Sequence, residues 1–245
     1  MSKKKNLVWK IALKLLEAKV GVASRYQLNL QQQDEIRKVV QVGDVLLDSN
    51  SAFPCSQLMA RVFFNTSWIH SGIYIGDGIV VDSGRKPHVA KINLTDFLQT
   101  TDLAVYRPEY QDASDCEAAV EFARKAVGKP FNVTFDEKNG KAFYCTQLVA
   151  EALASMPHPI HLERRSFFWK KVFPPASVAT CSQIKCVWSS HPSPLKAARC
   201  HTPIFAGAVT GGVAALVLTG SNIWLGALAG SFLTSRLIRD AKRVS

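Results

Sequence analysis

The sequence predicts an α+β fold, a small antiparallel sheet packed against helices, which is followed by a Gly-rich C-terminal membrane segment. Three observations support this prediction. Residues 69–83 contain two β-rich runs around a Gly-Asp-Gly turn, which is typical of a hairpin. Helical periodicity begins near Ser114 and again at Cys145. Residues 203–233 form a long apolar run without a charged side chain.

The composition describes a folded protein of one domain, or of one domain with appendages. Hydrophobic residues make up 47% of the 245 residues and charged residues 20%, which leaves room for one good core. The net charge is +11, and much of the excess lies at the two ends, in Lys3, Lys4, Lys5, Lys10, Lys14, Arg236, Arg239, Lys242 and Arg243. Basic ends that flank apolar segments indicate an anionic membrane surface as a partner. No helix-turn-helix pattern is present, and we expect no nucleic-acid partner.

The six cysteines of the chain are Cys55, Cys116, Cys145, Cys181, Cys186 and Cys200. An even count favours disulfides only in a secreted protein. The N-terminus does not resemble a cleaved signal, because Lys10, Lys14 and Glu17 interrupt its apolar region. We therefore expect reduced thiols and a main domain that faces the cytoplasm. The Cys and His spacings beyond residue 180 match no standard zinc pattern, so we expect neither a metal nor a cofactor.

The first 64 residues predict three helices and one strand. Residues 5–20 are amphipathic, with lysines opposite an apolar side, and form either a helix packed on the domain or an interfacial membrane helix. Residues 25–41 are polar, Gln-rich and helical in pattern. Residues 43–47 predict a turn followed by a buried strand, and residues 53–64 predict a helix that leads to the hairpin.

The hairpin at 69–83 brings a histidine and a carboxylate together. With a three-residue loop at 76–78, residue 75 pairs with 79, 74 with 80, and 72 with 82. His70 and Asp82 then lie on the same face as diagonal neighbours, about 7–8 Å apart at Cα. A carboxylate can reach an imidazole from this position. An acid that orients a histidine supplies two of the three members of a nucleophilic triad.

Short elements follow the hairpin. Two apolar pieces come first, and residues 104–107 predict another strand of the sheet. Ser114 stands three residues before Glu117, which is the spacing of a capping box and predicts that a helix begins there. Its expected buried side consists of Ala119, Phe122, Ala123 and Ala126. Gly128 and Pro130 end the helix, and a loop leads on toward Cys145.

Cys145 is the candidate nucleophile. It stands where an aromatic, strand-like run changes to a helical pattern, and a thiol at a helix N-terminus is stabilised as thiolate. We therefore expect Cys145 as nucleophile, His70 as base and Asp82 as the residue that orients His70. The alternatives are a core cysteine, a structural histidine and a polar residue at a strand end. Cys55 is a second candidate, because residues 53–60 resemble 143–150, but too few residues separate it from the hairpin for an intervening sheet.

The C-terminal part predicts a membrane segment. The apolar run at 203–233 exceeds the roughly 20 residues that a spanning helix needs, and two Gly-xxx-Gly spacings allow close helix contact in lipid. Residues 220–222 interrupt the run, so the segment is one long span, a hairpin of two short helices, or a buried core helix. We therefore divide the chain into N-terminal helices at 1–40, a catalytic domain at 41–175, a linker or cap at 176–202, a transmembrane helix or helical hairpin at 203–235 and a basic tail at 236–245.

The motifs, in their order, resemble the circularly permuted NlpC/papain-like hydrolases of the YiiX/YaeF type, which are related to lecithin–retinol-acyltransferase-like enzymes. The matching blocks are Gly-Asp-Val-Leu-Leu at 43–47, His-Ser-Gly-Ile-Tyr-Ile-Gly at 70–76, Gly-Lys-Pro-Phe-Asn at 128–132 and Phe-Tyr-Cys-Thr-Gln-Leu-Val at 143–149. The resemblance implies a permuted papain-like fold and a Cys145, His70 and Asp82 site without a cofactor. Family members often have Glu or His at the third position, and this chain has Phe131 and Asn132 where the family has Tyr and Asp.

The resemblance implies cleavage or transfer of an acyl group at an amide or ester. The first hypothesis is a membrane-associated cysteine hydrolase acting on an acyl-amide or acyl-ester substrate, either a lipid or a peptide. The second is a thiol acyltransferase that passes the acyl group from lipid or acylated substrates to an amine or alcohol. The third is a catalytically inactive membrane-interaction protein.

Overall fold

The computed structural model describes residues 27–135, 137 and 140–190, and every structural statement below concerns these residues. The predicted helix at 5–20, the apolar segment at 203–235 and the basic tail at 236–245 lie outside them. In the part of the chain that the structure describes, no helix is both long enough and apolar enough to cross a membrane.

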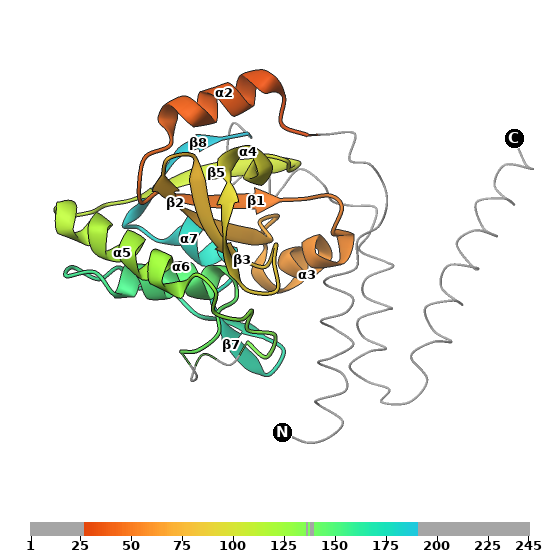
Figure 1. The fold of residues 1–245 in the computed structure, drawn as a ribbon. Helices are drawn as coiled ribbons and strands as arrows, with labels where there is room; N and C mark the ends of the chain where they lie inside the picture. Colours follow the sequence, from red (N-terminus) through yellow and green to blue (C-terminus); the bar gives the residue numbers. More distant parts are fainter. Residues whose placement is uncertain (1–26, 136, 138–139, 191–245) are drawn as a thin grey trace, which may run out of the picture. The chain divides into compact units, whose positions relative to one another are not determined.

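A six-stranded antiparallel sheet forms the centre of the fold (Figure 1). In chain order its strands are β1 (Val45–Ser49), β2 (His70–Gly76), β3 (Ile79–Ser83), β4 (Val89–Asn93), β5 (Asp102–Pro108) and β8 (Ile184–Ser189). Their order across the sheet is β4-β3-β2-β1-β5-β8. A separate two-stranded sheet pairs β6 (Arg165–Phe167) with β7 (Lys170–Val172).

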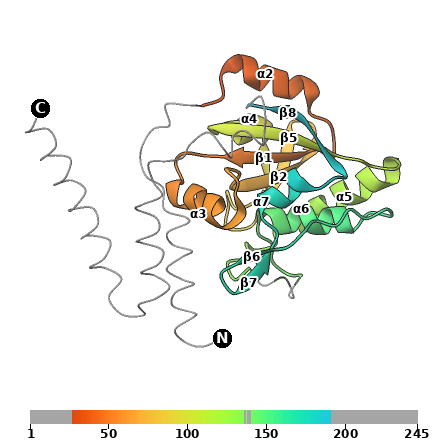
Figure 2. The same cartoon turned by 180° about the vertical axis from the view of Figure 1, so that it is seen from behind.

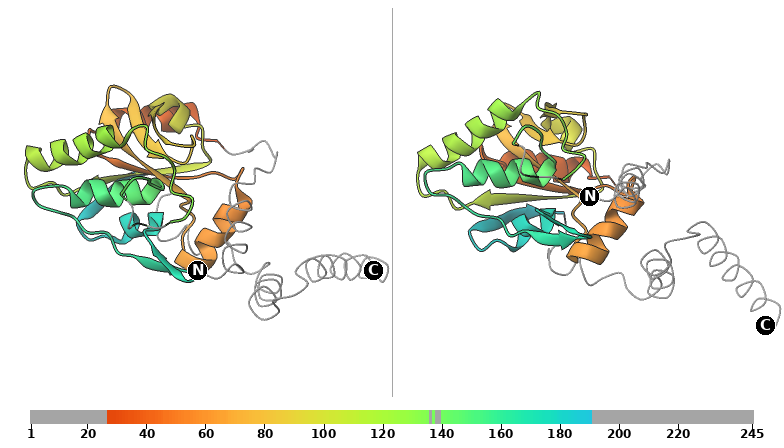
Figure 3. Two further views of the ribbon diagram at one scale, coloured as in Figure 1. Left: turned by 60° about the horizontal axis from the view of Figure 1, so that its bottom comes forward. Right: turned by 90° about the horizontal axis from the view of Figure 1, so that it is seen from below.

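Helices cover both faces of the sheet (Figures 2 and 3). They are α2 (Leu30–Val39), α3 (Pro54–Phe64), α4 (Leu94–Phe97), α5 (Ala113–Ala126), α6 (Cys145–Ala154) and α7 (Pro175–Thr180). The helices α5 and α6 lie side by side and contact β2. The helices α2 and α4 pack on the opposite face, where Ile36 and Phe97 are fully buried. The α+β prediction of an antiparallel sheet with helices is therefore confirmed.

The central strand β1 shows why the sheet needs both layers of helices. Val45 and Leu47 belong to the core under α5 and α6, whereas Leu46 belongs to the core under α2 and α4. Successive strand residues point to opposite faces, so this apolar run buries side chains on both. A short apolar strand of this kind is typical of a position with helices above and below.

The register of β2 and β3 confirms two of the three predicted pairs. Gly72 lies opposite Asp82 and Tyr74 opposite Val80. The expected pair of residues 75 and 79 is wrong, because Gly76 lies opposite Ile79 and the strand is irregular between positions 74 and 76. Asp77 and Gly78 both have positive φ, 52° and 70°, which is typical of a two-residue hairpin loop rather than the expected loop of three.

The start of α5 differs from the capping-box prediction. Asp112, not Ser114, is the N-cap, and its carboxylate accepts hydrogen bonds from the backbone N–H groups of Ser114 and Asp115. An aspartate oxygen satisfies these free donors at least as well as a serine hydroxyl does. The buried face includes Ala119, Ala123 and Ala126 as expected, while Phe122 is only partly buried.

The described residues after α6 contain regular structure, including part of the expected linker or cap at 176–202. They hold the β6–β7 hairpin, α7 and β8, and β8 pairs with β5 at the edge of the main sheet. Residues 184–189, which we expected in a linker or cap, are therefore a strand of the sheet. Only the first of the six β8 residues is buried and the next three are exposed, so its sequence lacks the clear alternation that identifies a half-buried strand.

Candidate active site

The β2–β3 hairpin places His70 beside Asp82 as the register requires. His70 is the first residue of β2, and its Nε2 lies 3.0 Å from Oδ2 of Asp82. The Asp82 side chain is 0% exposed and that of His70 is 14% exposed. Gly84 passes close to the ring with φ of 142°, and a Cβ at this position would lie 3.1 Å from His70 Cε1. A side chain at position 84 would therefore strain the backbone and press on the imidazole, so the position favours glycine.

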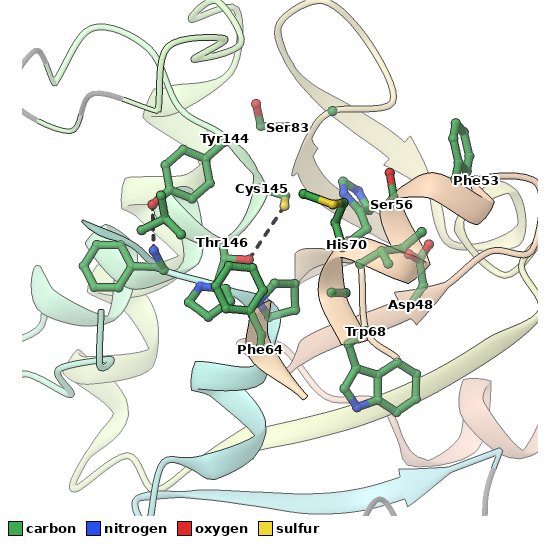
Figure 4. Close-up of a pocket in the computed structure, with 18 of the residues that line it drawn as sticks. Asp48, Phe53, Ser56, Phe64, Trp68, His70, Ser83, Tyr144, Cys145 and Thr146 are labelled. Atoms are coloured by element: carbon green, nitrogen blue, oxygen red, sulfur yellow. Dashed lines mark hydrogen bonds between the residues drawn. The ribbon is translucent and has the colours of Figure 1, made fainter. Parts of the chain in front are cut away.

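Cys145 is the first residue of α6, as predicted, and two buried hydrogen bonds hold this helix start against the hairpin. The Ser83 hydroxyl donates to the Phe143 carbonyl oxygen at 2.6 Å, and the Ser71 and Thr146 hydroxyls lie 3.2 Å apart. Cys145 Sγ lies 3.7 Å from the Thr146 hydroxyl, and Figure 4 shows the thiol on the His70 side of α6. Residues from β2, β3 and α6 thus meet at one place.

The thiol and the imidazole shift each other's pKa. Burial lowers the pKa of His70, but the hydrogen bond and the charge of Asp82 outweigh it, and with Cys145 and Asp48 they raise the pKa to about 10. Burial raises the pKa of the Cys145 thiol, but the hydrogen bond and the charge of His70 outweigh it, so its pKa lies below the ordinary value. The two groups therefore favour a thiolate beside an imidazolium, the state in which a cysteine attacks carbonyl carbon.

Arg85 and Asp48 extend the charged group behind His70. Arg85 Nη2 lies 2.5 Å from Asp48 Oδ2, and Arg85 Nε lies 3.2 Å from the Asp82 oxygen that contacts His70. The guanidinium stands 4.5 Å from the centre of the Phe97 ring, which in turn stacks with His70 at 5.9 Å and 29°. Asp82 is thus held between the base and a second cation, and Phe97 supports both.

The sequence analysis missed Arg85 and Asp48. Asp48 sits in a strand whose residues are all buried, and it lies opposite His70 in the β1–β2 pairing. A carboxylate in an otherwise apolar strand was the available indication, because a buried charge requires a partner. Nothing in the sequence near Arg85 identifies that partner, since Arg85 and Asp48 are 37 positions apart.

A cavity of about 680 Å³ opens beside Cys145 and His70. Its walls are mainly apolar. Aromatic side chains predominate among them, and the apolar lining residues are Phe53, Met59, Ala60, Phe64, Trp68, Phe131, Phe135, Phe167, Val172 and Phe173. Polar residues also line it, among them Asp48, Ser56 and Arg85, and Figure 4 shows Asp48 and Ser56 on the side of His70 away from the thiol. This volume is in the range of cavities that enclose a small-molecule ligand, and such walls suit an apolar group.

The second candidate, Cys55, lies in α3 as the second residue of the helix. It is a partly buried free thiol and does not line the cavity, although its neighbour Ser56 does. The structure therefore brings His70 together with Cys145 rather than with Cys55. Phe131 lines the cavity, whereas Asn132 is buried and donates to Gln147 at 2.9 Å.

The chain is similar to known proteins in sequence pattern and in fold. A family model described as permuted papain-like amidase enzyme, YaeF/YiiX, C92 family, matches residues 39–192. Among solved structures, the chain is similar to the crystal structure of the metalloprotein yiiX from Escherichia coli O157:H7. The TM-score is 0.54 at 14% sequence identity, covering 62% of this chain and 98% of that one, so this similarity concerns the fold. No curated protein sequence matches the chain significantly. The family expected from the ordered motifs is confirmed.

Proposed function

The chain belongs to the C92 family of permuted papain-like amidases, and we propose on this premise that it is a membrane-associated cysteine hydrolase that cleaves an acyl amide or ester. Cys145 is the nucleophile, His70 the base and Asp82 the residue that orients His70. The observation that carries this proposal is the contact of 3.0 Å between His70 and Asp82 beside a thiol whose pKa His70 lowers.

The reaction follows from these positions in two steps. The Cys145 thiolate forms a bond to the carbonyl carbon, and the carbonyl electron pair moves to the oxygen. The Cys145 backbone N–H is among the first-turn groups that lack an acceptor within α6, so it is placed to donate to this oxyanion. When the carbonyl reforms, the bond to the leaving group breaks, and His70 gives its proton to the departing amine or alcohol.

Water completes the cycle. His70, now neutral, accepts a proton from a water molecule that attacks the thioester carbon. The carbon–sulfur bond breaks, the acid leaves, and thiolate and imidazolium are restored. Asp82 keeps Nε2 of His70 engaged so that Nδ1 serves the reaction.

The cavity supports an apolar acyl group as the part of the substrate that is recognised. Its aromatic and aliphatic walls bury hydrocarbon, and each buried methylene contributes about 0.8 kcal/mol. A lipid or an acylated peptide fits this chemistry better than a polar peptide does. Acyl amides and esters are the proposed substrates. We also keep the expectation from the sequence that the main domain faces the cytoplasmic side of a membrane.

The solved relative is described as a metalloprotein, which raises the question of a metal here. Among the described residues, one group could bring three ligand atoms within 4.8 Å: Asp112, Asp115 and His158. Their oxygens already accept hydrogen bonds from the backbone N–H groups of Gln111, Ser114 and His158. This group caps α5 and packs against the chain after α6, far along that helix from Cys145. It does not fit a metal that takes part in the reaction.

Cysteine alkylation at a series of pH values tests the site. Each thiol is labelled in the full chain and identified by peptide mass spectrometry, in the wild type and in His70→Ala. We expect Cys145 alone to react rapidly below pH 7 and to lose this advantage without His70, because a thiol of ordinary pKa, about 8.5, is protonated there. Rapid labelling of Cys55 instead, or uniform slow labelling, overturns the assignment.

Product analysis then separates hydrolysis from acyl transfer. The protein is incubated with an acyl ester, with and without an added amine, and Cys145→Ala is the control. Free acid without acceptor supports the hydrolase. An acyl amine in place of the acid, formed only when amine is present, supports the transferase. No Cys145-dependent product from a series of acyl esters and amides favours an inactive interaction protein.

A further inference from the structure

Two buried hydroxyl groups and the Cys145 thiol form a row of polar groups that ends at the sulfur. Ser71 belongs to β2 and Thr146 to the first turn of α6, and both residues are 0% exposed. Their hydroxyl oxygens lie 3.2 Å apart, and the Thr146 hydroxyl oxygen lies 3.7 Å from Cys145 Sγ (Figure 4). The proposed chemistry does not yet give these hydroxyl groups a part in the reaction.

The two hydroxyl hydrogens need acceptors within the protein, because burial removes both groups from water. Among the described residues, the Ser71 hydroxyl has no hydrogen-bond partner other than Thr146, and the Thr146 hydroxyl contacts only Ser71 and Cys145. A buried donor without an acceptor destabilises the fold by about 1–3 kcal/mol in proteins generally. The acceptors within the row are the two hydroxyl oxygens and the sulfur, so the direction of donation decides whether both hydrogens are used.

One direction of donation uses both hydrogens. When Ser71 donates to Thr146, and Thr146 donates to Cys145 Sγ, each hydroxyl hydrogen has an acceptor. In the opposite direction Thr146 donates to Ser71, and the Ser71 hydrogen has no acceptor in the part of the chain that the structure describes. The first direction directs a hydrogen at the sulfur, which is a weak acceptor as a thiol and a much stronger one as a thiolate. The row is therefore best satisfied when Cys145 is ionised.

The ionisable side chains around the thiol come from several elements: Asp48 of β1, His70 of β2, Asp82 of β3, Arg85 after β3 and Tyr144 before α6. Burial raises the pKa of the Cys145 thiol, and the hydrogen bond and charge of His70 lower it. Hydrogen bonds from the Thr146 hydroxyl and the Thr146 backbone N–H lower it further. The thiolate therefore has a neutral hydroxyl as a donor in addition to the imidazolium.

We propose that Thr146 is a catalytic residue that donates its hydroxyl hydrogen to the Cys145 thiolate, and that Ser71 is a positioning residue that keeps Thr146 in the donating orientation. This role rests on the proposed function, because it serves the reaction only when Cys145 is the nucleophile. Thr146 acts again when water cleaves the thioester. The electron pair of the carbon–sulfur bond then returns to Sγ, and the hydroxyl donates to the new thiolate without transferring its proton.

The pH dependence of Cys145 alkylation tests this hydrogen bond. The full chain is treated with iodoacetamide as wild type, Thr146→Val and Thr146→Ser, and labelling of Cys145 is followed by peptide mass spectrometry. Valine keeps the branched shape of threonine without its hydroxyl. We expect its labelling midpoint to rise by about one pH unit, the usual contribution of a hydrogen bond to a charged group. Serine keeps the hydroxyl and is expected to restore the wild-type midpoint.

The labelling rate above the midpoint separates a lost hydrogen bond from a displaced thiol. A thiolate of higher pKa is more nucleophilic, so the limiting rate of Thr146→Val is expected to rise about threefold. A thiol that has turned away from the cavity labels more slowly instead. In the His70→Ala background, Thr146→Val should still raise the midpoint by about one pH unit, because the hydroxyl donates to the sulfur itself and does not act through His70.

Two more variants complete the comparison. Ser71→Ala is expected to raise the Cys145 midpoint by a few tenths of a pH unit, because Thr146 loses the donor that orients and polarises its hydroxyl. Thr100→Val is the matched control. Thr100 is 1% exposed, and its hydroxyl donates to the Ser49 carbonyl oxygen at 3.1 Å, so its replacement removes a buried threonine hydroxyl without altering the thiol. Thermal unfolding shows whether each variant is folded.

Four results overturn the proposal: a Thr146→Val midpoint equal to that of the wild type, a limiting rate that falls in this variant, a shift that disappears without His70, or a Ser71→Ala midpoint that is unchanged or lower. If Thr146→Val does not fold, the sign of the Ser71→Ala shift decides. The proposed function fails separately. A wild-type midpoint of an ordinary thiol that His70→Ala does not alter refutes the Cys–His pair, whereas the Thr146 comparison is still measured.

Discussion

Replacing Arg85 by Met removes the cation between two buried carboxylates and is expected to destabilise the fold. Arg85 lies 2.5 Å from Asp48 and 3.2 Å from Asp82, whose side chains are 3% and 0% exposed. At an effective dielectric constant of about 20, these contacts correspond to roughly 5–7 kcal/mol of Coulomb attraction each before desolvation is subtracted. Removing one partner of a buried ion pair has a net effect of about 3–5 kcal/mol. Since the Arg85 side chain is 25% exposed, we expect the lower limit, about 3 kcal/mol.

Urea unfolding followed by tryptophan fluorescence measures this loss. The midpoint should fall at a nearly constant m-value, and the melting temperature should drop by roughly 6–12 °C. Arg37→Met is the matched control, because its ion pair with Asp34 is largely exposed and its loss changes the free energy of unfolding by less than about 0.5 kcal/mol. Asp48→Asn in the Arg85→Met background should recover about half of the loss, because it removes the uncompensated charge.

Two outcomes would refute the reasoning. If Arg85→Met unfolds within about 0.5 kcal/mol of the wild type, the guanidinium is effectively solvated and its buried contacts contribute little. If Asp48→Asn destabilises the Arg85→Met variant further, the carboxylate at position 48 is satisfied without Arg85, and the group does not act as a charge-balanced unit.

Two further perturbations concern the site itself. The value of kcat/KM should follow a bell-shaped pH profile, since the ion pair exists only above the pKa of the Cys145 thiol and below that of His70. The acid limb should lie below the ordinary thiol pKa of about 8.5, and the alkaline limb near pH 10. A value of kcat/KM that first rises above about pH 8.5 contradicts this expectation. Gly84→Ala should slow Cys145 alkylation, because the added Cβ displaces the imidazole. Gly78→Ala is the control: it has a positive φ of 70° but no atom within 4 Å of the added Cβ, so it introduces backbone strain alone. Equal alkylation rates in the two variants would show that His70 keeps its position.

Local patterns predicted the half of the site that lies in the hairpin. Side chains alternate along a strand, so a loop position fixes which residues share a face, and the pair of Gly72 and Asp82 followed directly. The tip was wrong by one residue because the sequence Gly-Asp-Gly permits several loop lengths, and only the backbone angles distinguish them. The error did not propagate to His70 and Asp82, since the irregularity between positions 74 and 76 restores the expected register.

The sequence predicted the position of Cys145 at the start of a helix, but its approach to His70 came from the expected chemistry and the resemblance to a family. The contacts that produce this approach join residues 60 and 75 positions apart, Ser83 with Phe143 and Ser71 with Thr146. Small hydroxyl side chains have no periodicity that identifies such partners. Arg85 with Asp48 and the edge strand β8 escaped prediction for the same reason, because each depends on a partner distant in the sequence.

The order of the segments along the chain also decides when the Cys145 thiol becomes reactive. A ribosome releases the β2–β3 hairpin first, and its base and carboxylate come together through neighbouring strands alone. The proposed nucleophile Cys145 emerges later, and it meets His70 only after α6 has packed against Ser71 and Ser83. Until then Cys145 is an ordinary cysteine without a neighbouring imidazolium. A chain that is incomplete, or whose α6 has detached, therefore lacks the pairing of Cys145 with His70 that lowers the pKa of the thiol.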